Sequence, residues 1–172
     1  EDILLISRLD EGAGRELFED VELSSVITQT VESLSPKAEE NGVTIQISCE
    51  TAVLKANRSQ IYELLYNLID NAIKYNKPGG TVGINVTEGG GELALSVSDT
   101  GIGIPKEAQG RVFERFFRVD RSRSKKTGGT GLGLAIVKHI ALAHSGRIEL
   151  KSEAGTGTTI TVRFKKREGP ES

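Results

Sequence analysis

The chain has 172 residues, a formal net charge of −2 and a single cysteine, Cys49. This length suits one domain with its own core, and the near-neutral charge gives no general electrostatic reason to bind nucleic acid. A lone cysteine excludes an internal disulfide, which fits a reducing cytoplasm, and no apolar run approaches the ~18 residues of a membrane span, so we expect no membrane contact by this fragment.

The first twelve residues, EDILLISRLDEG, have helix-compatible apolar spacing that ends at Gly12. An isolated helix of that length is marginal in water, so the pattern predicts the end of a longer helix. The chain contains no methionine and begins at Glu1, so we expect it to be part of a longer protein.

Residues 17–23 alternate well enough to predict an edge strand. Ser24 or Ser25 can cap a following helix, which the pair Asn41-Gly42 would end. Pro36 falls inside that span, so either the helix kinks there or a second helix starts at Pro36. Residues 43–47 then alternate as a strand, and a short apolar run follows over 52–54.

Residues 57–75 predict the central helix of the domain. Its apolar residues recur at i, i+3, i+4 and i+7, and Asn57 with Gln60 resembles a capping box at its start. Helical winding places Glu63, Asn67, Asn71 and Lys74 in a polar stripe beside the apolar face, with Tyr75 nearer the boundary. The stripe is either a solvated surface, or a set of neutral oxygen ligands for Mg²⁺ with a cation for phosphate.

A turn at residues 78–80 and two strands, 81–87 and 92–99, predict a hairpin through residues 89–91. In the second strand Leu93, Leu95, Val97 and Asp99 share one face, so the carboxylate points the same way as the core residues and should receive hydrogen bonds. A capping role for Asp99 in the following turn is the alternative. That turn, DTGIGIP, contains two glycines that allow a close backbone approach.

Residues 106–131 are polar and cationic, and three phenylalanines among them have helical spacing, which favours packing anchors over a ligand site. Next comes GGTGLG, which opens a helix with one apolar face, and a glycine-rich turn at a helix N-terminus presents N–H groups that can bind phosphate. The cluster fits neither the Rossmann nor the P-loop pattern. Residues 147–151 and 158–164 predict two further strands.

Four motifs resemble those of one family. NLIDNAIKYN is similar to the N box, DTGIGIP to the first glycine box, RVFERFFRVD to the F box and GGTGLGLAIVKHI to the second glycine box of bacterial sensor histidine kinases. The F box is most similar to that of phosphate-regulon and cell-wall-regulating sensor kinases. All four occur in the family's order across residues 67–140.

The resemblance implies an α+β fold of the GHKL (Bergerat) type, a two-layer sandwich in which a mixed sheet packs against helices. It implies three segments: the end of a dimerisation and histidine-phosphotransfer helix over residues 1–12, a catalytic ATP-binding domain over 13–166 and a frayed tail over 167–172. The parent would be a homodimer anchored in the bacterial membrane, with this domain in the cytoplasm.

The resemblance also assigns the site. Asn71, assisted by Asn67, would hold Mg²⁺, and Lys74 would meet phosphate oxygens. Tyr75 would stack beside adenine, and Asp99 would accept the adenine amino hydrogen and thereby select against GTP. The remaining implied residues are Gly101, Gly103 and Ile104 for the base, Arg115 and Arg118 as lid residues for phosphate, and Gly129, Thr130, Gly131 and Leu132 for the triphosphate. The lid would span roughly residues 119–129 and order on the nucleotide.

The resemblance implies transfer of the ATP γ-phosphoryl group to a histidine, for passage to a response-regulator receiver domain. The family's acceptor histidine is missing, because His139 falls on an apolar helix stripe and His144 at a helix end. The acceptor would therefore lie on the protein's own histidine-phosphotransfer domain. A regulatory nucleotide-binding module without transfer is the alternative, and a gyrase-type ATPase would need an acid where the chain has Asn67.

Overall fold

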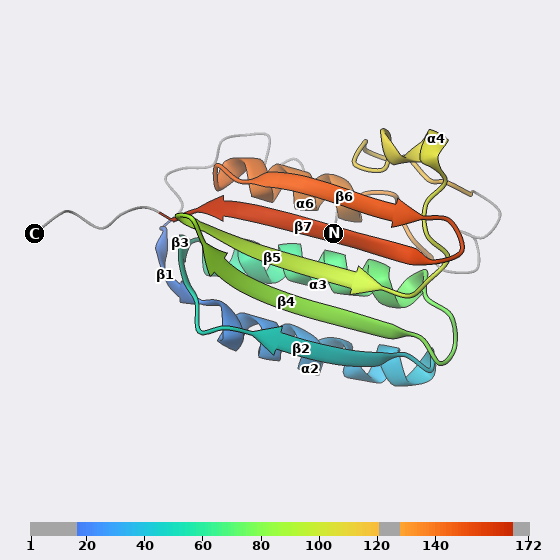
Figure 1. Cartoon of the computed structure of the whole chain (residues 1–172), viewed down its shortest axis with the longest axis horizontal. Coiled ribbons are helices and arrows are strands. Elements are labelled where there is room, and N and C mark those ends of the chain that lie inside the picture. Colours follow the sequence, from blue (N-terminus) through green and yellow to red (C-terminus); the bar gives the residue numbers. More distant parts are fainter. Residues whose placement is uncertain (1–16, 121–127, 167–172) are drawn as a thin grey trace, which may run out of the picture.

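The computed structural model describes residues 17–120 and 128–166. The predicted end of a longer helix (1–12), the predicted tail (167–172) and most of the predicted lid (121–127) lie outside the described residues. The described part forms an α+β fold of two layers, with a mixed sheet packed against helices, as the sequence predicted (Figure 1).

One layer is a five-stranded sheet with the strand order β2-β4-β5-β7-β6. Strand β2 pairs in parallel with β4, and the other neighbouring strands pair antiparallel. The predicted hairpin through residues 89–91 is confirmed, because β4 and β5 pair across that turn. The strands span Thr44–Cys49 (β2), Thr81–Gly89 (β4), Glu92–Asp99 (β5), Arg147–Glu153 (β6) and Gly157–Lys165 (β7).

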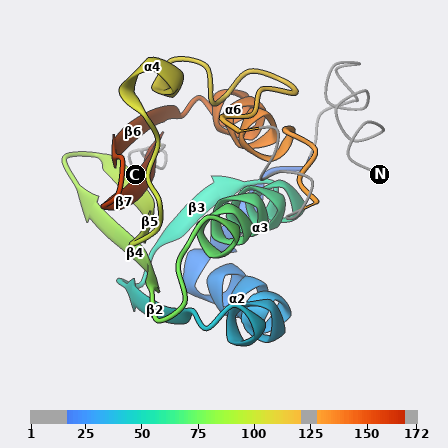
Figure 2. The same ribbon diagram turned by 90° about the vertical axis from the view of Figure 1, so that its right-hand side faces the viewer.

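The other layer consists of helices α2 (Leu23–Glu40), α3 (Arg58–Lys74) and α6 (Gly133–Ala143). All three cover the same face of the sheet, and α3 lies between α2 and α6 (Figure 2). A one-turn helix, α4 (Lys106–Gln109), contacts β6. No helix in the described ranges is long and apolar enough to cross a membrane.

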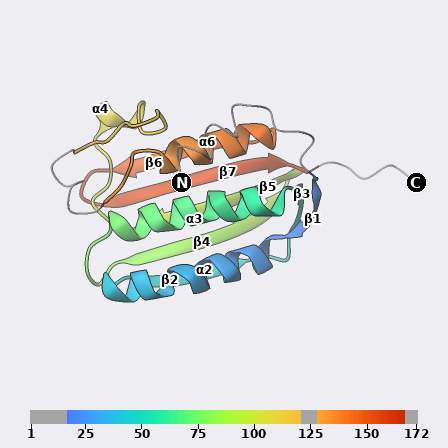
Figure 3. The same cartoon turned by 180° about the vertical axis from the view of Figure 1, so that it is seen from behind.

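A small second sheet lies at one end of the helical layer. Strand β1 (Glu19–Glu22) pairs antiparallel with β3 (Val53–Ala56). Figure 3 shows both strands at that end of the molecule. The predicted edge strand is therefore confirmed, and the short apolar run before Asn57 contributes its partner.

The core forms where the apolar faces of the two layers meet. Leu93, Leu95 and Val97 point from β5 into this core, as their alternation predicted. Burial of these side chains removes apolar surface from water, at roughly 25 cal/mol per Å². The helices supply the opposing residues, among them Ile61, Leu64, Leu65, Leu68, Ile69, Ile136, Val137 and Ile140.

Helix α2 departs from the sequence prediction at two places. It begins at Leu23 with Glu22 as N-cap residue, so neither Ser24 nor Ser25 is the cap, and Ser24 Oγ donates instead to Glu22 Oε1 at 2.8 Å. The helix also continues through Pro36, so of the two alternatives left open by the sequence, a second helix that starts at Pro36 is wrong. Pro36 is exposed, and burial of Leu34 and Ala38 on the opposite side holds the helix together across the missing hydrogen bond.

The start of α3 is capped by two different residues. Asn57 Oδ1 accepts the N–H of Gln60 at 3.1 Å, which is one half of the predicted capping box. The other half is wrong, because the Asn57 N–H donates to Nε2 of His144 at 3.2 Å and not to Gln60. His144 Nδ1 lies 2.8 Å from the carbonyl of Ile140, so Nδ1 carries the proton and Nε2 accepts.

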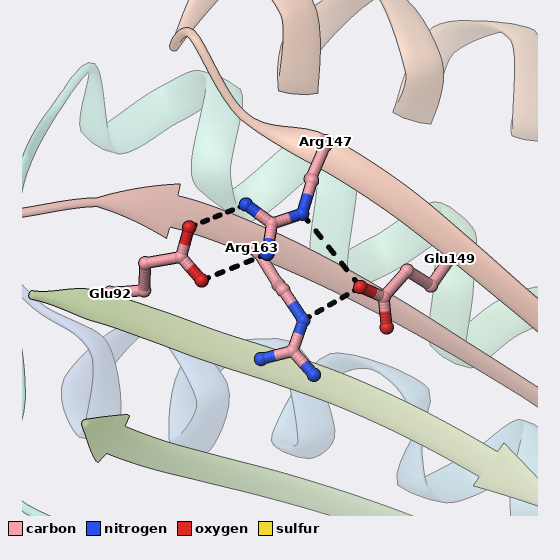
Figure 4. A network of polar contacts seen from close by, with 4 residues as sticks. All are labelled: Glu92, Arg147, Glu149 and Arg163. Carbon is pink, nitrogen blue, oxygen red and sulfur yellow. Dashed lines mark hydrogen bonds and ion pairs between the residues drawn. The ribbon is translucent and has the colours of Figure 1, made fainter. Parts of the chain in front are cut away.

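The sheet face turned away from the helices carries a charged network that joins β5, β6 and β7 (Figure 4). Arg147 contacts both Glu92 and Glu149, and Arg163 Nε lies 2.8 Å from Glu149 Oε1. The hydrogen bond from Arg147 lowers the pKa of Glu92, and the hydrogen bond from Arg163 lowers that of Glu149. These groups are open to water, so the network adds little to stability.

Candidate nucleotide-binding site

Asn67, Asn71 and Lys74 occupy successive turns of α3 and line one cavity. The buried face of α3 fixes the rotation of the helix, so these polar side chains point toward α6 and the sheet. Asn67 Nδ2 donates to the carbonyl of Glu63 at 2.8 Å. The amide oxygen consequently faces the start of α6, where a Cβ added at Gly133 would lie 3.1 Å from Asn67 Oδ1.

The Lys74 ammonium is held by a carboxylate on its own helix. Lys74 Nζ lies 3.0 Å from Asp70 Oδ2, and Asp70 Oδ1 contacts Nζ of Lys37 on α2. Asp70 also lines the cavity. The polar stripe predicted on α3 is thus wider than the sequence pattern suggested.

Asp99 lies at the end of β5, in the cavity wall. Its Oδ1 accepts the N–H of Gly101 at 2.9 Å, and the N–H of Thr158 on β7 also donates to the carboxylate. Burial raises the pKa of Asp99 above its usual value, although these two N–H groups act in the opposite direction. The acid is therefore half-buried, and it is supported by the loop that follows β5 and by strand β7.

The loop after Asp99 packs directly against backbone. A Cβ added at Gly101 would lie 2.2 Å from the carbonyl oxygen of Tyr75, and one at Gly103 would lie 2.0 Å from that of Glu153. Gly103 also has a φ of +66°, which side chains rarely adopt. Close chain packing thus accounts for both glycines.

Ile104, a cavity residue, is fixed by strand β6 and helix α4. Its N–H donates to Ser152 Oγ at 2.8 Å, and its carbonyl accepts from Gln109 Nε2 at 2.9 Å. The same amide nitrogen of Gln109 reaches the carbonyl of Ser152 at 3.1 Å. Side chains far apart in sequence therefore set the shape of this wall.

The segment after α4 contradicts one prediction. Its phenylalanines do not share a helix, because the chain runs through turns from residue 110 onward. Phe116 has a φ of +63° and is 62% exposed, so it is not a packing anchor. Phe117 lines the cavity, and the Arg111 guanidinium lies 4.5 Å from its ring centre.

Two cations and a phenol converge on the glycine-rich turn before α6. A Cβ added at Gly129 would lie 3.2 Å from Arg118 Nη2, 3.8 Å from Tyr75 Oη and 3.9 Å from Lys74 Nζ. The N-cap residue of α6 makes no side-chain cap, so the first N–H groups of α6 keep their positive partial charge. An anion beside this turn would meet both sources of positive charge.

These elements enclose a cavity of about 510 Å³, within the usual range for small-molecule sites. Its wall contains the predicted residues Asn67, Asn71, Lys74, Tyr75, Asp99, Gly103, Ile104, Arg118, Gly129, Thr130 and Gly131. Three predicted residues do not line it: Gly101 packs on backbone, the Leu132 side chain is buried in the core, and Arg115 is exposed.

Sequence reasoning missed part of the wall. Val112, Phe117, Thr158 and Ile160 line the cavity, as does Asp70. Val112 and Phe117 lie in the motif RVFERFFRVD, but no site role was predicted for either. Thr158 and Ile160 belong to no motif, and strand pairing brings them to the site. Asp70 had a local signal, since it precedes Asn71 on the polar side of α3.

The wall combines three kinds of chemistry. Ile104, Val97 and Ile160 offer apolar surface, Asp99 is a hydrogen-bond acceptor beside them, and Lys74 with Arg118 supplies positive charge near Gly129. A flat heterocycle with an exocyclic amino group and a polyanionic tail matches this pattern.

The fold and the site together define a nucleotide-binding ATPase domain of the GHKL class. The chain belongs to the family of histidine kinase-, DNA gyrase B- and HSP90-like ATPases, whose model matches residues 56–168.

The chain is similar to several sensor histidine kinases. The chain is 39% identical to the sensor-like histidine kinase SenX3 of Mycolicibacterium smegmatis over 99% of its own length and 45% of that protein. It is similar to the solved mycobacterial sensor histidine kinase MprB, with 30% identity, a TM-score of 0.78, and coverage of 88% of this chain and 100% of that one. Full-length ShkA in complex with AMPPNP gives 30% identity, a TM-score of 0.80, and coverage of 99% and 36%. The chain thus spans less than half of SenX3.

Proposed function

We propose that this chain is the ATP-binding catalytic domain of a sensor histidine kinase, which transfers the γ-phosphoryl group of ATP to a histidine on another domain of the longer protein. One observation carries the proposal: a half-buried acid and a pair of cations occupy the same cavity, with Tyr75 between them. The Tyr75 carbonyl contacts the loop after Asp99, and its hydroxyl lies near Gly129.

Asp99 would accept the amino hydrogen of adenine. Its carboxylate is already oriented by the N–H groups of Gly101 and Thr158, so it would not need to reorganise when the base arrives. Guanine presents a carbonyl at the equivalent position, which would repel the carboxylate and leave two acceptors face to face. The same residue would therefore bind ATP and reject GTP.

Lys74 and Arg118 would bind the phosphates together with the backbone of residues 129–131. Phosphoryl transfer depends on positioning and charge neutralisation, which these groups can supply. Arg115 is exposed and outside the cavity wall, so we give Arg118 the main phosphate role among the two arginines.

The α3 stripe fits Mg²⁺, which when bound would neutralise phosphate charge. Mg²⁺ prefers oxygen ligands and binds few protein groups when phosphates share its shell. Asn71 and Asn67 both line the cavity, and the Asn67 oxygen faces α6 because its nitrogen is engaged by Glu63. These two amides would therefore hold the ion.

The proposal extends to partners. The acceptor histidine would lie on the protein's own dimerisation domain, and the phosphoryl group would pass to a response-regulator receiver domain. The parent would be a homodimer anchored in a bacterial membrane, with this domain in the cytoplasm. Support comes from the sensor-kinase relatives, which are longer than this chain.

The decisive experiment supplies the missing acceptor. The chain is mixed with labelled ATP, Mg²⁺ and a separate histidine-phosphotransfer domain from its parent, and acid-labile label on that domain is followed. We expect transfer in trans, none with Asn71→Ala, and no label on the chain itself. ATP binding without transfer would favour the regulatory module, and label on His139 or His144 would contradict the assignment of the acceptor.

A further inference from the structure

Asp70 is a carboxylate in the cavity wall that the proposed function does not use. Its two oxygens contact two different lysines: Oδ2 lies 3.0 Å from Lys74 Nζ, and Oδ1 contacts Nζ of Lys37. The side chain of Asp70 is 14% exposed and that of Lys74 is 18% exposed. The two charges are thus largely removed from water, where their interaction is stronger than on an open surface.

Lys37 belongs to a different helix and lies outside the cavity wall. Helices α2 and α3 run side by side in the same direction, so their C-terminal turns lie together (Figure 3). Lys37 is in the last turn of α2, and Lys74 is in the last turn of α3. The negative end of each helix dipole favours a cation there. Asp70 bridges the two cations.

Lys37 offsets the negative charge that Asp70 places beside Lys74. A carboxylate beside a phosphate-binding lysine would cancel its charge and would itself repel phosphate. Lys37 restores the balance, because the three side chains together carry one net positive charge. The local charge at Lys74 therefore depends on a residue that lines no part of the site.

We propose that Asp70 is a positioning residue that holds the Lys74 ammonium beside Gly129, and that Lys37 is the counter-charge that keeps this position attractive to the phosphates of ATP. The inference rests on the proposed function and deepens it. An ammonium has three N–H donors, so Lys74 can donate one to Asp70 and still present others to phosphate oxygens. Fixing a long side chain before the nucleotide arrives lowers the entropic cost of binding.

The alternative is that Lys37 and Asp70 form an ion pair that only holds α2 against α3. Loss of Lys37 would then lower stability without a preference for phosphorylated ligands. The two readings differ in how ATP and adenosine respond, because adenosine lacks the phosphates.

The test measures the dissociation constants of Mg·ATP and adenosine by calorimetry at low and high salt, for the 172-residue chain and four variants. Lys37→Gln removes the counter-charge, and Asp70→Asn removes the carboxylate. The double variant Lys37→Gln/Asp70→Asn replaces both charges with amides, which also guards against a folding defect from an unpaired buried acid. Lys77→Gln, at an exposed position three residues beyond Lys74, is the control for net charge.

We expect Lys37→Gln to weaken Mg·ATP roughly tenfold at low salt, less at high salt, and to leave adenosine unchanged. The Mg·ATP affinity of the double variant should return to within about threefold of that of the unchanged 172-residue chain, and the affinity of Lys77→Gln should stay within about twofold of it. Asp70→Asn removes a negative charge that repels phosphate, which should offset the lost positioning of Lys74, so Mg·ATP should bind no more weakly than to the unchanged chain. Phosphate transfer to a supplied acceptor domain should be at least about tenfold slower, because Lys74 is no longer held in place.

Three results would overturn the inference: equal ATP affinities for Lys37→Gln and Lys77→Gln, no recovery in the double variant, or an unchanged transfer rate in Asp70→Asn. Each of these results leaves the proposed function intact if the unchanged 172-residue chain binds Mg·ATP. If the unchanged chain binds no ATP, the proposed function and this inference are both rejected.

Discussion

The surroundings of Asp99 disfavour the ionised form of its carboxyl group. Burial raises its pKa, and hydrogen bonds from Gly101 and Thr158 compensate only in part. A group held in such a state is typical of binding and catalytic sites, because selection for function outweighs its cost in stability.

Changing Asp99 to Ala should weaken ATP binding by about 2 kcal/mol, or roughly 30-fold, because the adenine amino group would lose its acceptor within a closed wall. Discrimination against GTP should also fall, since the repelling carboxylate is gone. Titration calorimetry with both nucleotides measures the two effects. An unchanged affinity for ATP would contradict the assignment of Asp99 to the base.

The raised pKa of Asp99 also predicts how stability depends on pH. The folded state binds the proton of Asp99 more tightly than the unfolded state does. The protonated side chain therefore adds to the unfolding free energy, and this contribution is fully present below the usual pKa of 3.8 and is lost as the pH rises through the raised pKa. The unfolding free energy of the parent, minus that of Asp99→Asn, should therefore increase as the pH falls from 7 toward 4. Urea titrations at several pH values test this sign, and a flat difference would count against it.

At the level of elements, the loop over residues 100–105 connects the end of helix α3 with the turn between β6 and β7. It bonds to the end of α3 through Ile102 and Tyr75, and to the β6–β7 turn through Gly155. The contact at Gly103 leaves no room for a side chain, because Glu153 lies against it. The loop is thus shaped by packing on both sides before any ligand binds.

Gly103→Ala should lower the unfolding free energy by more than about 2 kcal/mol, because it combines an unfavourable positive φ with a backbone clash. Gly89→Ala is the control, since its Cβ would meet no atom within 4 Å and its φ is not positive. That change should alter stability by less than about 0.5 kcal/mol. Chemical denaturation of both variants measures the difference, and equal stabilities would show that the loop adapts.

At the level of the whole molecule, the cavity and the contacts of His144 that connect the helices to the sheet lie at opposite ends of α3. The cavity is near Lys74, at the C-terminal end of α3. At the N-terminal end, the Asn57 N–H donates to His144, the residue that follows α6. The His144 ring also stacks on Phe18 at 4.8 Å and meets Phe164 edge-on at 6.2 Å. One neutral imidazole therefore joins the N-terminal segment, two helices and the sheet.

His144→Ala should destabilise the domain by about 1–3 kcal/mol, because it leaves the Asn57 N–H without its acceptor and removes two ring contacts. ATP affinity should stay within about twofold, since the change is at the far end of α3. His139→Ala on the same helix serves as the comparison in thermal and urea unfolding. Equal stability of the two variants would show that His144 is an ordinary helix-end residue.

Local patterns predicted much of this molecule because their physical causes are local. The helical period of residues 57–75 fixed the buried face of α3 and with it the polar stripe, and period-two alternation placed Asp99 on the inner face of β5. Local signals failed where two patterns competed. The serines after Leu23 resembled a cap, and the spacing of the phenylalanines resembled a helix that the turns after α4 do not form.

By itself, the sequence predicted most of the helices and strands and the residue types of a nucleotide site, and its resemblance to a known family implied the two-layer α+β class. Only the tertiary structure decided that Thr158 donates a hydrogen bond to Asp99 and that His144 completes the cap of α3. It also decided that Asp70 bridges Lys74 and Lys37. The reason is separation along the chain: these partners belong to different elements, and no period or motif records which strands pair or which helix ends meet.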